Sequence, residues 1–179
     1  MLFEKLFTHE IASARPRIVD LEEPIQLVGM KIDTNIRSIY RDVPALGRQF
    51  EQYKSSHEIP NKKRPWGFAA VSKGFDREKG TFPYLIGDTV TDIEHIPAGL
   101  ICYEIPCLKY AVFPIRPKNR FGWPIAIASA KRYIYDTWLP QSEYEAAGVI
   151  DDFEYHDERS VRKCSPEIDL YVAIKPKRQ

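Results

Sequence analysis

Ile168-Asp169-Leu170-Tyr171-Val172-Ala173-Ile174, close to the C-terminus, alternates between two kinds of residue. The even-numbered residues are all aliphatic, whereas the odd-numbered ones include an acid and a tyrosine. Successive side chains of a β-strand point to opposite faces, so this period of two predicts a strand with one apolar face. We expect that face to pack against a layer of helices.

Two helices are predicted by apolar residues that recur every three to four positions. One spans 121–139 and ends at Pro140. Its apolar stripe consists of Ile127, Ala130, Ile134 and Trp138. The other begins at Asp42, a candidate N-cap, with Pro44 in its first turn. Its apolar face consists of Val43, Leu46, Phe50 and Tyr53.

The remaining apolar stretches predict strands, and their order indicates a duplication. The predicted strands are 18–32, 66–75, 81–92, 100–115, 152–158 and 167–175. We expect 18–32 to be a strand pair or one bent strand, 100–115 to be hairpin-like, and Gly87 to mark a bulge or bend. Each half of the chain then reads strand, helix, strand, strand.

This order predicts an α+β fold of duplicated β-α-β-β units, with antiparallel sheets and one helix per repeat. We expect a lead-in over 1–17 and a small-molecule-binding domain over 18–179, with repeats at roughly 18–95 and 96–179. If each helix covers one sheet face, the opposite faces are free to form a ligand groove between the repeats.

Composition argues against several classes of protein. Hydrophobic residues make up 44% and charged residues 28% of the chain, which is typical of a globular domain. The 26 basic and 25 acidic residues leave a net charge of +1, so we expect no direct contact with nucleic acid. No apolar run reaches the roughly 20 residues of a membrane helix, and the N-terminus lacks the pattern of a signal peptide. We therefore expect a cytoplasmic protein with no membrane contact.

The cysteines and histidines indicate neither a disulfide framework nor a metal site. The 3 cysteines lack CxxC spacing, and the 4 histidines are scattered singly. We expect reduced thiols, no metal and no cofactor.

Candidate binding residues lie on the predicted strand 152–158. If Phe153 and Tyr155 face the helices, Glu154 and His156 face the other side of the sheet. The strand quoted at the outset would then send Asp169 and Tyr171, among others, to the same side as Glu154. A polar face of this kind lines either a pocket or a solvent-exposed sheet.

Aromatic residues on the predicted strands favour a pocket. They are Trp66, Phe68, Tyr84, Tyr103, Tyr110 and Tyr171. Each alone is equally compatible with a core position, but 10 tyrosines are many for one domain, and buried hydroxyls need partners. A carboxylate among aromatic rings attracts cationic or amphipathic ligands. We expect the pKa of Glu154 to be raised in the empty pocket and lowered when a cation binds.

The same residues could act in acid–base catalysis, with Glu154 and either Tyr84 or Tyr110. The chain contains no G-x-S-x-G, phosphate-loop or H-E-x-x-H motif. We assign no catalytic residue and expect a binding protein, with a hydrolase as the alternative.

Over 17–177 the chain resembles the GyrI-like family, also called the AraC-type effector-binding domain. The resemblance depends on the order and spacing of several segments, namely 81–87 (TFPYLIG), 96–99 (IPAG), 109–113 (KYAVF), 133–142 (YIYDTWLPQS), 143–145 (EYE), 152–155 (DFEY) and 168–174 (IDLYVAI).

The resemblance implies a groove that binds hydrophobic, often cationic compounds. Glu154 matches the family's pocket glutamate, and Tyr84 matches a family aromatic. His156 stands where the family has tyrosine, and Asp169 where it often has glutamate. The predicted ligand-binding residues are Glu154, Tyr84, Trp66, Phe68, Tyr110, Tyr171, His156 and Asp169.

The resemblance also bears on the partners that we expect for this chain. Many relatives carry a helix-turn-helix region ahead of this domain, and we expect this chain to act without one, as a stand-alone protein that senses or sequesters ligands. A third possibility is a protein-interaction module, directed at gyrase or a transcription regulator, or a homodimer. Leu2, Phe3, Leu6 and Phe7 would then contact the partner or a second copy, but we favour a helix that docks on its own domain.

Overall fold

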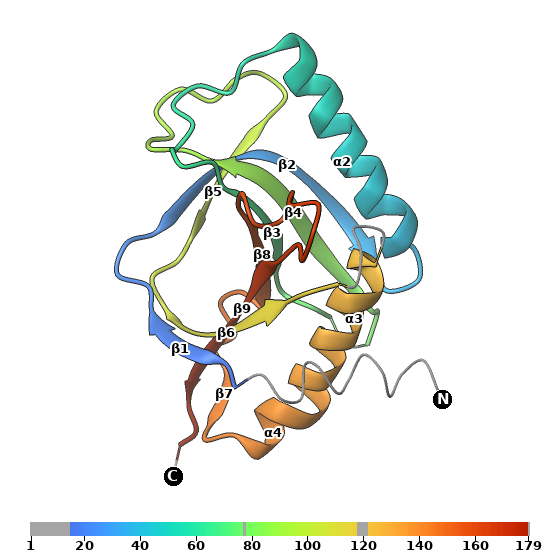
Figure 1. Ribbon diagram of the computed structural model, residues 1–179, viewed down its shortest axis with the longest axis vertical. Helices are drawn as coiled ribbons and strands as arrows, with labels where there is room; N and C mark the ends of the chain where they lie inside the picture. The colour runs from blue at the N-terminus through green and yellow to red at the C-terminus, as the bar shows by residue number, and fades with distance from the viewer. Residues whose placement is uncertain (1–14, 77, 118–121, 179) are drawn as a thin grey trace.

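The computed structural model describes residues 15–76, 78–117 and 122–178 (Figure 1). The residues proposed above to contact a partner, 1–7, lie outside these ranges. The strands are β1 (Arg17–Asp20), β2 (Ile25–Asn35), β3 (Phe68–Ser72), β4 (Thr81–Thr89), β5 (Ile101–Ile105), β6 (Lys109–Ile115), β7 (Tyr144–Ala146), β8 (Asp152–His156) and β9 (Ile168–Pro176). The helices are α2 (Ile39–Ser56) and α3 (Trp123–Tyr133), the latter continuing through the π-helical turn η1 (Ile134–Trp138) into α4 (Leu139–Gln141).

All of these strands belong to one antiparallel sheet. Its order is β1-β6-β9-β8-β3-β4-β2-β5, with β7 paired to β9. The order is symmetric about the β3–β8 pair: β2, β4 and β3 on one side match β6, β9 and β8 on the other. The predicted α+β fold of duplicated β-α-β-β units is therefore confirmed.

One strand of each repeat pairs with a strand of the other repeat. β1 pairs with β6 of the second repeat, and β5 pairs with β2 of the first. The prediction of a hairpin over 100–115 is therefore wrong, because β5 and β6 follow one another in the chain but lie at opposite ends of the sheet. Likewise 18–32 forms two strands, β1 and β2, that do not pair with each other.

The exchanged strands close the sheet on itself. Only residues 21–24 join β1 to β2, so the two ends of the sheet must come together. The connections meet where the Leu21 N–H donates to the Leu108 carbonyl at 3.0 Å. The sheet therefore curls around an apolar interior, with α2 and α3 both outside it (Figure 1). The buried members of this interior are Leu27, Ala69, Val71, Leu85, Ile105, Tyr110, Val112, Ile150, Phe153 and Ala173.

The helices cover the outer face in two separate clusters. Leu46 and Phe50 of α2 pack on β2, β3 and β4, whereas Ala126, Ala130 and Ile134 pack on β6 and β9. The aliphatic residues of β9 face this second helix cluster, as the period of two predicted.

Both helix boundaries differ from prediction. α2 begins at Ile39, and Asp42 lies inside it, where it accepts hydrogen bonds from Ser38 Oγ at 2.5 Å and Thr34 Oγ1 at 2.8 Å. Asp42 thus ties the first turn to the end of β2 rather than capping the helix. The second helix widens before Pro140, where the Leu139 N–H donates to the Ile134 carbonyl five residues back, and it continues through Pro140 to Gln141.

Gly87 does not form a bulge, because β4 keeps continuous register with β2 and β3. It lies opposite Gly29 and Ala69, in a row of small residues on the inner face. A Cβ on Gly29 would lie 1.8 Å from the Ile86 carbonyl oxygen, and one on Gly87 would lie 2.9 Å from that of Val28. These glycines give the sheet the room that it needs to bend inward.

We predict that Gly29→Ala lowers the free energy of unfolding by about 3 kcal/mol or more, because backbone atoms cannot yield to the added methyl group. The matched control is Gly47→Ala in α2, where an added Cβ meets nothing within 4 Å. It should stabilise the protein by about 0.5–1 kcal/mol through helix propensity. Urea denaturation measures both, and similar effects of the two changes would refute this account of the bend.

Candidate functional site

Glu154 faces the helices, contrary to the prediction. In the sheet it lies between Ala70 of β3 and Leu170 of β9. Ala70 belongs to the cluster under α2 and Leu170 to the cluster under α3. The prediction assumed that Phe153 and Tyr155 face the helices, but they face the apolar interior. The error arose because the curled sheet buries both of its faces, so aromatic residues mark the inner face as well as the outer one.

The predicted site residues are consequently divided between two faces. Phe68, Tyr84 and His156 share the outer face with Glu154, as their register shows. Tyr110 and Tyr171 contribute to the interior cluster.

Asp169 and Trp66 lie apart from Glu154 as well. Asp169 is held by Arg159 Nη2 at 2.8 Å and Arg17 Nη2 at 3.4 Å. Trp66 precedes β3 in a loop and is 36% exposed, because the strand predicted over 66–75 forms only over Phe68–Ser72.

At the junction of the repeats, between the two helix clusters, polar side chains converge. We call this group the seam site and define it as Ser72, Tyr84, Lys131, Asp152 and Glu154. β8 supplies the two carboxylates, and α3 supplies the lysine. Lys131 Nζ lies 2.8 Å from Asp152 Oδ1, 3.1 Å from Glu154 Oε1 and 3.4 Å from Ser72 Oγ.

Lys131 reverses the expected direction of the shift in the pKa of Glu154. Burial by itself would raise the pKa of this carboxyl, but the Lys131 ammonium, helped by His156, outweighs burial and holds the pKa below its usual value. Burial likewise would lower the pKa of Lys131, and the charges of Asp152 and Glu154 raise it instead. Both groups are therefore charged at neutral pH.

Two tyrosines complete the polar surroundings. Tyr135 donates its hydroxyl proton to Asp152 Oδ2 at 2.9 Å. Tyr84 is buried, and both burial and the nearby charge of Glu154 raise the pKa of its hydroxyl. Each phenol therefore stays protonated and neutral beside the carboxylates.

His156 connects Glu154 to two further aromatic rings. His156 Nε2 lies 3.9 Å from Glu154 Oε2, beyond hydrogen-bond length. The imidazole stands edge-on to the Phe68 ring, with 5.5 Å between centroids, and lies 6.2 Å from the Trp123 ring. His156 therefore lies between the second oxygen of the Glu154 carboxylate and two further rings, one from β3 and one from α3.

Lys131 and Asp152 were not among the predicted site residues, although the sequence contains a signal for each. Lys131 comes four residues after Ile127 and three before Ile134, so it interrupts the apolar stripe of its helix. A charged residue at such a position requires a buried partner. Asp152 lies two residues before Glu154 and so shares its face.

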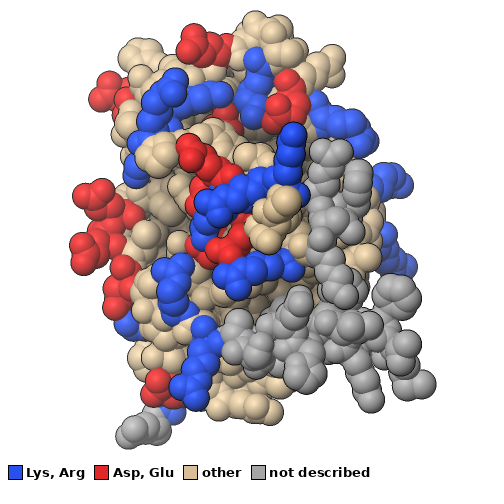
Figure 2. Space-filling model, in the orientation of Figure 1, with Lys and Arg blue, Asp and Glu red and all other residues tan. Residues whose placement is uncertain are grey.

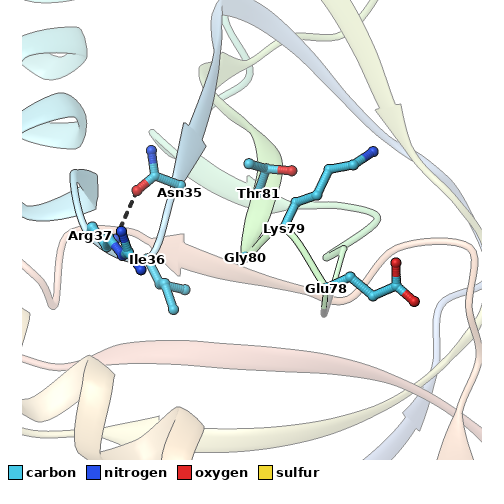
Figure 3. Close-up of a pocket in the computed structure, with 7 residues that line it drawn as sticks. All are labelled: Asn35, Ile36, Arg37, Glu78, Lys79, Gly80 and Thr81. Atoms are coloured by element: carbon cyan, nitrogen blue, oxygen red, sulfur yellow. Dashed lines mark hydrogen bonds between the residues drawn. The ribbon is translucent and has the colours of Figure 1, made fainter.

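A separate hollow lies where β2 ends and β4 begins (Figure 3). Its volume is about 400 Å³, and it is lined by residues 35–37 and 78–81. There the Arg37 N–H donates to Asn35 Oδ1 at 2.9 Å. The lining contains no aromatic ring and no member of the seam site.

The surface mixes both signs of charge. Basic and acidic side chains are interspersed over the face drawn in Figure 2, which agrees with the small net charge. Among the described residues, no helix has the length and apolar character to cross a membrane.

Comparison with known proteins decides the family. Residues 17–174 match the family model of integron-associated effector-binding proteins, Cass2. The chain belongs to this family. The match confirms the resemblance to GyrI-like effector-binding domains.

One curated relative of this Cass2-family chain is the transcriptional regulator BrlR of Pseudomonas aeruginosa. The two are 33% identical over 135 residues, which make up 72% of this chain and 46% of BrlR. The chain thus spans about half the length of that relative.

Solved structures share the fold at low sequence identity. An integron cassette protein from Vibrio cholerae is 12% identical with a TM-score of 0.59, and the match covers 89% of this chain and 95% of that one. SAV2435, solved bound to tetraphenylphosphonium, is 14% identical with a TM-score of 0.67 and coverages of 90% and 94%. The C-terminal domain of EcmrR is 10% identical with a TM-score of 0.63 and coverages of 90% and 97%.

We predict that Glu154→Gln lowers the free energy of unfolding by about 1–3 kcal/mol at pH 7, because Lys131 loses one of its two ionic partners. The pKa of Glu154 is lowered in the folded state, so the ionised carboxylate stabilises the fold above pH 4.5. This stabilisation is lost as the pH falls below 4.5 through the folded-state pKa. The difference between variant and wild type should therefore shrink toward pH 3.5.

Urea denaturation at pH 7, 5 and 3.5 checks this expectation. Glu78→Gln is the control, since Glu78 is exposed and its change should have little effect at any of the three values. A stability difference for Glu154→Gln that stays constant with pH would contradict the ion pair.

Proposed function

We propose that this protein binds lipophilic organic cations at the seam site, with Glu154 as the anionic anchor. One observation carries the proposal: two buried carboxylates face a single lysine between the helix clusters. Asp152 and Glu154 carry two negative charges, and Lys131 supplies one positive charge. The site therefore attracts a cation.

The surroundings suit a cation with aromatic or apolar substituents. The imidazole of His156 lies 3.9 Å from Glu154 Oε2, and the rings of Phe68 and Trp123 lie next to that imidazole. Contact between a cation and a ring face contributes about 0.5–2 kcal/mol, and the burial of apolar groups adds about 25 cal/mol per Å². Both contributions favour bulky, weakly hydrated cations.

The family supports the proposal. Cass2 proteins are effector-binding proteins, and SAV2435, which has the same fold, was solved with a lipophilic phosphonium bound. BrlR is named a transcriptional regulator, so a sensing role is a natural extension. Sensing and sequestration both begin with the binding step proposed here.

The seam site favours binding over hydrolysis. Glu154 has a lowered pKa, so it is ionised at neutral pH and cannot serve as a general acid. Tyr84 has a raised pKa and stays protonated, which makes it a poor nucleophile. Tyr110, the other candidate for catalysis, lies in the interior and donates its hydroxyl proton to the Pro106 carbonyl at 2.8 Å.

We predict that tetraphenylphosphonium binds the wild-type protein and binds Glu154→Gln at least about tenfold more weakly, a loss of about 1.4 kcal/mol. The reason is that Gln removes the anchoring charge while keeping the size of the side chain. Isothermal titration calorimetry, or quenching of tryptophan fluorescence, measures both affinities.

Two controls sharpen this test. Tetraphenylborate has the same shape and the opposite charge, so it should bind wild-type protein far more weakly than the phosphonium. Glu78→Gln removes an acid from the other hollow and should leave phosphonium affinity unchanged. Equal affinity of wild type and Glu154→Gln for the phosphonium would reject Glu154 as the anchor.

A further inference from the structure

Lys131 lies where a cationic ligand would have to bind. Its ammonium nitrogen is 3.1 Å from Glu154 Oε1 and 2.8 Å from Asp152 Oδ1. Its side chain is 23% exposed, compared with 8% for Glu154 and 4% for Asp152. Of these three side chains, that of Lys131 is therefore the most accessible to solvent.

This lysine differs from a purely structural counter-ion in two respects. It has a long flexible stem that begins on the surface-facing helix, so its ammonium can move into water while the stem still covers apolar surface. It also leaves the site one positive charge short, since two carboxylates share one ammonium. A second cation therefore gains electrostatic energy on entering, and it gains more if Lys131 withdraws.

We propose that Lys131 is a tethered competitor, whose ammonium occupies the Glu154 anchor in the free protein and is displaced toward solvent by the ligand. The inference rests on the proposed function of the seam site. It adds a residue that determines specificity, and it defines more narrowly the class of cation that the site accepts.

Competition with Lys131 would select among cations by how strongly they are hydrated. An ammonium tethered to the chain has a high effective concentration at Glu154, and it is itself a compact, strongly hydrated cation. A small free ammonium ion offers the carboxylate nothing that Lys131 does not already supply. A cation with several apolar rings gains contact with Phe68, His156 and Trp123 in addition, and so can displace the lysine.

Substitution tests the competition. Lys131→Met keeps the length and apolar stem of the side chain, and it should bind tetraphenylphosphonium at least tenfold more tightly than wild type. Phenethylammonium, a small primary ammonium with one ring, should gain at least as much, because it competes least well with the lysine.

The matched control is Lys54→Met. Lys54 is a partly buried lysine of α2 that pairs with the buried Asp88, so this variant loses the same charge from the other helix. It should change phosphonium affinity less than twofold. If Lys131→Met binds both cations no more tightly than wild type does, the competition is disproved.

A second measurement uses wild-type protein and does not depend on how well the variants fold. Reductive methylation with formaldehyde and a borohydride reports the accessibility of each lysine amine by peptide mass spectrometry. Saturating tetraphenylphosphonium should increase the labelling rate of Lys131 severalfold and leave that of Lys54 unchanged. Protection of Lys131 by the ligand would overturn the inference, because the lysine would then remain beside the bound cation.

The two proposals fail in different ways. If neither wild type nor Lys131→Met binds any cationic probe, the proposed function is rejected, and the inference falls with it. Suppose instead that wild type binds the phosphonium through Glu154, but that Lys131→Met binds cations no more tightly and the ligand does not increase the methylation of Lys131. Only the inference is then rejected.

Discussion

The exchange of edge strands between the two repeats is the constraint on which the rest of the structure depends. Because residues 21–24 must connect strands from opposite ends of the sheet, the sheet has to curl until those ends meet. Gly29 and Gly87 allow the backbones to approach on the inner face. The curl encloses an interior that neither helix touches, so the sheet is buried on both faces.

Burial of both faces explains where the polar residues gather. Each helix covers its own repeat, and the outer face at the β3–β8 junction belongs to neither cluster completely. Glu154 and Asp152 lie there because β8 is a central strand whose alternate residues must face outward. The carboxylates are deep enough to need a partner, and Lys131 from α3 supplies it. The ion pair thus also ties the second helix to the middle of the sheet.

In the proposed function, the same ion pair connects stability with binding. Two buried carboxylates that share one ammonium are compatible with a stable fold, yet they retain one negative charge for the proposed ligand. Paired in this way, Glu154 stays ionised at neutral pH rather than protonated. The proposed anchor is therefore charged before any ligand arrives.

Much of this could be predicted from the sequence alone, since it depends on local spacing. The period of two in residues 168–174, the apolar stripe around Ile134 and the order of elements predicted the duplicated fold. The alternation of the strand 152–158 and the family resemblance drew attention to Glu154. Tertiary structure decided the face on which Glu154 lies, because alternation separates two faces without saying which one meets the helices. It also decided the partner: only folding brings α3 over β8 and places Lys131 against carboxylates more than twenty residues away. For that reason the sequence predicted Glu154 without a counter-ion, whereas the structure pairs Glu154 with Lys131.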